Sequence, residues 1–124
     1  MQYQESFDNL LKMIKALYDA GITIVPGTDA MPGFSYHKEL EHYVSAGIPA
    51  AEVLRMATIT SAKVTGSGNE LGSIQAGKLA DLILVDGNPA ENISDIRRVE
   101  LTIKDGKIYQ PEQLYRAIGV GYFE

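Results

Sequence analysis

The sequence contains no cysteine, which excludes disulfides, a thiolate nucleophile and a cysteine-ligated zinc site but leaves the redox compartment open. Histidine is also scarce, since His37 and His42 are the only two. They lie five positions apart, and a helix would turn them away from each other. The pair therefore lacks the spacing of a His-Glu-Xaa-Xaa-His metal site.

Positive charge and long apolar runs are scarce as well. The chain has 11 Lys and Arg against 16 Asp and Glu, which gives a formal net charge of −5. This balance argues against nucleic acid or an anionic membrane as a partner. No apolar stretch is long enough to span a bilayer, and the first residues do not resemble a secretory signal. We therefore expect a cytoplasmic protein whose partners are small molecules or other proteins.

A short β-branched run at residues 22–25 is followed closely by the carboxylate of Asp29. Such a run between helical patterns is typical of a strand buried on both faces, and α/β enzymes place their chemistry beyond the carboxyl ends of these strands. Asp29 is thus the first candidate catalytic residue. The alternative is an ordinary turn or helix N-cap aspartate, which is common after Gly-Thr.

Helical patterns surround this run. Apolar residues recur at helical spacing between residues 7 and 18, and Gly21 stands where a helix commonly ends. Ser35 is positioned to begin a second helix that ends near Gly47, and Pro49 to begin a third. The residues predicted to face the core of these helices are Tyr36, Leu40, Tyr43, Val44, Val53, Leu54 and Met56.

The pattern changes near Gly66, which predicts a division into residues 1–66 and 67–124. Residues 79–85 and 99–103 have the character of strands, and Asp105-Gly106 is typical of a tight hairpin turn. Residues 111–118 predict a terminal helix. The second half is therefore expected to be mainly β.

Five segments share their order and spacing with a known family. Residues 27–30 read Gly-Thr-Asp-Ala, 37–41 His-Lys-Glu-Leu-Glu, 46–49 Ala-Gly-Ile-Pro with Leu-Arg-Met-Ala-Thr at 54–58, and 72–85 include Gly-Lys-Leu-Ala-Asp-Leu. In this order they resemble the C-terminal portion of the amidohydrolase superfamily, in particular its imidazolonepropionase-like and Xaa-Pro dipeptidase-like members. The resemblance covers nearly the whole chain.

The resemblance implies an α/β plus β chain: the last helix-strand-helix segment of a metal-dependent (β/α)₈ barrel, followed by part of a small accessory β-sandwich. A complete barrel of this kind needs about 250 residues, twice the present length. Asp29 would be the aspartate of strand eight, which touches the metal or its water and transfers a proton. The divalent metal, often zinc, activates water for attack on an amide-like carbon–nitrogen bond. His37 would contact the substrate, although a solvated histidine in the first helical turn is an equal alternative.

The remaining metal ligands of the superfamily come from earlier strands that this chain does not contain. A catalytic zinc needs about three protein ligands. The chain alone is therefore expected to bind metal weakly or not at all and to be inactive. An unpaired strand at residues 22–25 further predicts either self-association or docking with an upstream barrel segment. The alternative to an enzyme segment is a non-catalytic interaction or scaffold domain of the same ancestry.

Other polar residues are expected to be structural. Glu39, Glu41 and Glu52 occupy helical positions that alternate with apolar ones, which is typical of a solvated helix face. His42 is expected at the surface. Lys78 is expected to be structural, because the glycines around it do not form a phosphate-binding loop.

Overall fold

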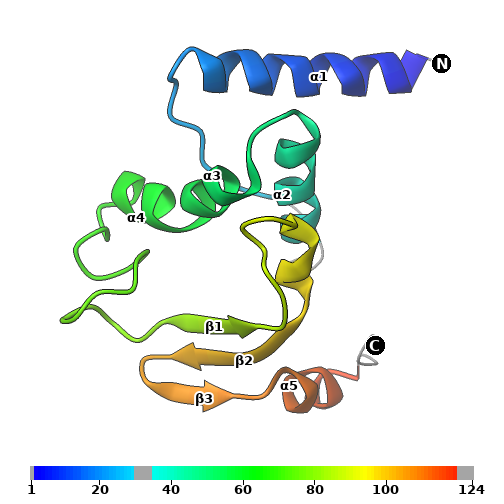
Figure 1. Ribbon diagram of the computed structural model, residues 1–124. Coiled ribbons are helices and arrows are strands. Elements are labelled where there is room, and N and C mark those ends of the chain that lie inside the picture. The colour runs from blue at the N-terminus through cyan, green and yellow to red at the C-terminus, as the bar shows by residue number, and fades with distance from the viewer. Residues whose placement is uncertain (1, 30–34, 120–124) are drawn as a thin grey trace.

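The computed structural model describes residues 2–29 and 35–119 (Figure 1). The first half is helical, and the second half contains a small antiparallel sheet. In Figure 1, helix α1 lies apart at one end of the molecule, helices α2 to α4 occupy the middle, and the sheet lies at the opposite end with α5 beside it. No helix among the described residues is both long and apolar enough to cross a membrane.

Helix α1 (Gln2–Asp19) confirms the first predicted helix. It ends where Gly21 adopts a φ of +73°, and the N–H groups of Gly21 and Ile22 donate to the carbonyls of Tyr18 and Leu17. This arrangement satisfies carbonyls that the helix end would otherwise leave without donors, and glycine adopts the left-handed conformation without strain. Leu10 and Met13, however, are each 53% exposed.

The predicted strand at residues 22–25 is wrong for this chain as it stands. Residues 22–29 follow α1 without regular secondary structure. A strand is defined by its hydrogen-bonded neighbours, and no described segment pairs with these residues. The β-branched pattern is present, but the sheet that it would join is not formed by the described part of the chain.

Helix α2 (Ser35–Ser45) and α3 (Ala50–Arg55) form the centre of the core. The chain continues through a π-helical turn, η1 (Met56–Thr60), into α4 (Ser61–Val64). The core predictions are confirmed: four of the predicted residues are buried, and the other three pack against them. The buried cluster consists of Leu40, Tyr43, Ile48, Ala50, Val53, Met56 and Ile93.

The sheet has three antiparallel strands in the order β1-β2-β3, namely β1 (Leu82–Val85), β2 (Val99–Lys104) and β3 (Lys107–Tyr109). The hairpin predicted at Asp105-Gly106 is confirmed, with φ of +50° and +73° at the two turn residues and Lys104 paired with Lys107. Helix α5 (Pro111–Ala117) confirms the terminal helix. The described residues form this one sheet, so the second sheet of a sandwich stays a prediction.

The 3-10 helix η2 (Ile93–Arg97), which the sequence patterns did not predict, joins the two halves. Its Ile93 is buried in the same cluster as Leu40 and Val53. Helix η2 also contacts both α2 and α3. Apolar residues from both sides of Gly66 therefore share one core, while the division at Gly66 stays a prediction.

Candidate functional site

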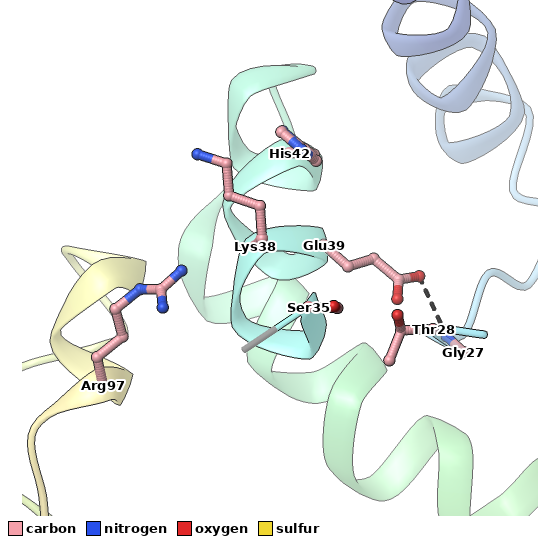
Figure 2. Close-up of a pocket in the computed structure, with 7 residues that line it drawn as sticks. All are labelled: Gly27, Thr28, Ser35, Lys38, Glu39, His42 and Arg97. Carbon is pink, nitrogen blue, oxygen red and sulfur yellow. Dashed lines mark hydrogen bonds between the residues drawn. The ribbon is translucent and has the colours of Figure 1, made fainter. Parts of the chain in front are cut away.

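Asp29 is the last described residue of the irregular segment that follows α1, and its side chain is exposed. His37 lies in the first turn of α2 and is half-buried. An open hollow of about 650 Å³ lies close by, between the Gly27-Thr28 backbone, α2 and η2. Neither Asp29 nor His37 is among the described residues that line it, which are Gly27, Thr28, Ser35, Lys38, Glu39, His42 and Arg97 (Figure 2). The hollow therefore does not include the two predicted site residues, and their roles stay predictions.

Glu39 connects α2 to the segment that carries Asp29. Its Oε1 accepts a 3.1 Å hydrogen bond from the backbone N–H of Gly27, drawn as a dashed line in Figure 2. The same oxygen accepts a 2.5 Å hydrogen bond from the hydroxyl of Tyr43. Burial, and next the hydrogen bond to Glu39, raise the pKa of the Tyr43 hydroxyl, which therefore stays a donor. The carboxylate of Glu39 is held between two elements of the fold.

Glu41 makes a second polar link, between α2 and η2. Its Oε1 accepts a 2.8 Å hydrogen bond from Nε of Arg97 and a 3.1 Å hydrogen bond from the hydroxyl of Ser94. Chiefly through the hydrogen bond from Arg97, the pKa of the Glu41 carboxyl falls to about 2. The expectation of a solvated face is therefore wrong for Glu39 and Glu41, because residues 22–29 fold against one side of α2 and η2 against another. Glu52, paired with Arg55 at 3.6 Å, is nearly half-exposed.

His42, which was expected at the surface, is only partly exposed. The residue is half-buried, and its ring meets the ring of Phe7 on α1 edge to face, with centroids 5.0 Å apart and planes at 72°. Aromatic rings prefer this geometry because the positive edge of one faces the negative face of the other. His42 therefore belongs to the contact between α1 and α2, which sequence spacing within α2 could not reveal.

The polar residues of the Gly-Lys-Leu-Ala-Asp motif are structural, as expected for Lys78. The ammonium of Lys78 donates to the carbonyls of Gly68, at 2.6 Å, and Leu71, at 3.1 Å. Asp81 accepts from the backbone N–H of Asp105 at 2.8 Å and pairs with Lys104. Lys78 thus closes the loop before β1, and Asp81 fastens the start of β1 to the hairpin turn.

The described residues do not by themselves fit a metal ion. They contain no cluster of three or more His, Asp or Glu side chains that could hold one. Asp29 supplies a single carboxylate, whereas a catalytic zinc site needs about three protein ligands. Any metal site that includes Asp29 therefore requires ligands from outside the described part of this chain.

Sequence reasoning missed Glu39 as a residue that organises this site. One signal was available, since Glu39 and Tyr43 are four residues apart and so face each other along a helix. The contact with Gly27 spans 12 residues and depends on how the irregular segment folds back over α2. That contact has no local signal in the sequence.

Comparison with known sequences gives a consistent match. The sequence profile described as "Amidohydrolase family" matches residues 7–109. The imidazolonepropionase of Shouchella clausii is 32% identical over 102 residues, which cover 76% of this chain and 23% of that protein. The 5'-deoxyadenosine deaminase of Methanobrevibacter smithii is 43% identical over 70 residues, which cover 46% of this chain and 16% of that protein.

Comparison with solved structures agrees with the sequence matches. The crystal structure of a Xaa-Pro dipeptidase with bound methionine in the active site superposes with a TM-score of 0.76 at 40% sequence identity. The match covers 81% of this chain and 25% of the dipeptidase chain. The chain therefore spans about a quarter of the length of this relative and of the imidazolonepropionase.

Proposed function

Since the chain belongs to the amidohydrolase family, we propose that it is the C-terminal segment of a metal-dependent enzyme that hydrolyses carbon–nitrogen bonds in small molecules or dipeptides. The observation that carries this proposal is the family match over residues 7–109. The relatives named above include an imidazolonepropionase, a deaminase and a dipeptidase, whose names indicate different substrates. They support a reaction class and leave the substrate open.

Within that enzyme, Asp29 is the proposed catalytic residue and metal ligand, and His37 the proposed substrate contact. The exposure of Asp29 supports this role, because its carboxylate is accessible to groups outside the chain. A carboxylate is also a hard ligand that suits a divalent cation such as zinc and can accept a proton. The bound ion would supply an activated water. This chain's contribution would be one carboxylate held at a defined place.

The other ligands are proposed to come from an upstream barrel segment. Two features of the described chain support docking with such a segment. The apolar side chains of Leu10 and Met13 on α1 are half-exposed, and so is Ile22 at 54%. Residues 22–25, which have a strand's composition, pair with no described segment. An upstream segment would bury the side chains of Leu10, Met13 and Ile22. It would also supply hydrogen-bond partners to the backbone of residues 22–25. The isolated chain is accordingly proposed to bind metal weakly and to be inactive.

Complementation tests the enzymatic proposal. The chain is mixed or co-expressed with the upstream barrel segment encoded at its own locus, zinc is added, and hydrolysis of a panel of Xaa-Pro dipeptides and cyclic amides is measured. We expect activity only when both pieces are present, and a loss of about 100-fold or more in Asp29→Asn, the range of a positioned proton-transfer group.

A non-catalytic scaffold is the second candidate, and the observation that favours it is the lack of a three-ligand cluster among the described residues. The two candidates differ in the complementation experiment. Binding of the upstream segment without gain of zinc affinity or activity would favour the scaffold. An upstream reading frame without a His-Xaa-His pair would do the same.

A further inference from the structure

Glu39 lies on a well-anchored part of α2. The adjacent residue Leu40 is fully buried in the core. The hydroxyl of Tyr43 donates a hydrogen bond to Oε1 of Glu39. One turn further on, Tyr43 is itself buried. A fully buried leucine resists displacement because moving it would open a cavity. Glu39 is therefore attached to a part of α2 that the core holds in place.

The segment that Glu39 reaches is held differently: Ile24 packs against the core three residues before Gly27. Residues 22–29 have no regular secondary structure, so no helix or strand ladder fixes the backbone on either side of Gly27. The N–H of Gly27 donates to Oε1 of Glu39, and Figure 2 shows the Glu39 side chain extending from α2 towards Gly27. Hydrogen bonds to an ionised carboxylate are stronger than those between neutral groups. Asp29 follows Gly27 by two residues.

We infer that Glu39 is a positioning residue, which holds the Gly27 backbone against α2 and thereby fixes the place of Asp29. The inference rests on the proposed function, because the place of Asp29 matters only if its carboxylate takes part in the reaction. The second carboxylate oxygen, Oε2, is buried without a hydrogen-bond partner among the described residues. Such an atom is costly to bury, which indicates a role that the stability of α2 alone does not explain.

The first test needs no activity. Hydrogen exchange and ¹⁵N relaxation are measured by NMR on the 124-residue chain and on three variants, Glu39→Ala, Glu39→Gln and Glu52→Ala. We expect exchange of the Gly27 amide to accelerate about tenfold or more in Glu39→Ala, since its acceptor is lost, and the heteronuclear NOE of Asp29 to fall. Glu39→Gln keeps an acceptor oxygen and should restore most of both signals. Glu52→Ala removes a glutamate from the neighbouring helix α3 and should leave both unchanged.

Unchanged Gly27 exchange and Asp29 order in Glu39→Ala would overturn the inference. If Glu39→Ala does not fold, the comparison moves to Tyr43→Phe, which removes one donor to the carboxylate without a large change of volume. Increased mobility of Asp29 in that variant supports the inference, and an unchanged Asp29 overturns it.

A second test uses the complemented enzyme. Glu39→Ala should lower kcat about tenfold or more while KM changes little, because the reacting carboxylate is misplaced, and Glu39→Gln should recover much of the loss. The two proposals fail separately. If the unaltered pieces show no hydrolysis, the proposed function fails, while the NMR comparison still decides whether Glu39 positions Asp29.

Discussion

The guanidinium of Arg97 donates a 2.8 Å hydrogen bond from Nε to the carboxylate of Glu41, across a separation of 56 residues. This contact joins α2, which also bears His37 and Glu39, to the 3-10 helix at the entry to β2. It lies at the border of the open hollow, which Arg97 helps to line. The helical half and the sheet half are therefore linked by a charged pair as well as by the shared core.

Stability should depend on pH through Glu41. Its pKa is lowered from 4.5 to about 2 in the folded chain, so the pair stabilises the fold above pH 4.5, and this contribution is lost as the pH falls towards 2. Glu41→Gln should lower the free energy of unfolding by about 1 kcal/mol at pH 7, a modest loss because solvent screens the pair. Urea unfolding at several values between pH 2 and pH 7 measures this difference, which should shrink in acid. An equal difference at all pH values would contradict the assignment.

Gly72 should be sensitive to substitution. It has a φ of +83°, and an added Cβ would lie 2.7 Å from Cβ of Ala62 and 2.8 Å from Cα of Ile59. Gly72→Ala is expected to lower the free energy of unfolding by about 2–4 kcal/mol, since backbone strain and steric overlap combine. Gly77→Ala is the matched control, because Gly77 also has a positive φ but open space around it. The control should lose only about 1 kcal/mol, from backbone strain alone. Equal losses in thermal unfolding would count against the close packing at Gly72.

Lys78 should stabilise the loop that precedes β1. Lys78→Met keeps most of the aliphatic stem but removes the donor to the carbonyls of Gly68 and Leu71, so the free energy of unfolding should fall by about 1–2 kcal/mol. The Leu79 amide, which donates to the carbonyl of Glu70, should exchange faster in this variant. Lys12→Met, on the exposed side of α1, is the control and should change little. Unaltered exchange at Leu79 would show that the loop is held by other contacts.

The apolar residues of α1 should matter for docking more than for the isolated chain. Leu10→Ser and Met13→Ser alter side chains that are half-exposed here, so the isolated chain should lose only about 0.5 kcal/mol of stability each. Affinity for the upstream barrel segment should fall about tenfold or more for the double variant, because each side chain would be buried in the complex. Calorimetric titration gives the affinity, with Asn9→Ala as control. Unchanged binding would place the docking surface elsewhere.

The composition of residues 22–25 illustrates how a correct pattern can give an incorrect element. The β-branched run indicates a strand, but a strand needs a neighbour, and the described part of this chain provides none. The hairpin turn predicted at Asp105-Gly106, by contrast, was confirmed. Both residues adopt positive φ, and the two strands that they connect lie directly on either side, so the local signal was sufficient.

The sequence by itself determined the features that depend on neighbouring residues: the helix ends at Gly21 and Gly47, the apolar stripe of α2 and the hairpin turn. These follow from backbone sterics and side-chain spacing within a few positions. Only the tertiary structure decided that Glu39 reaches Gly27, that Glu41 pairs with Arg97 and that His42 meets Phe7. Burial and pairing depend on which distant segments cover a helix face. The spacing of side chains along a helix is the same whether that face meets water or protein.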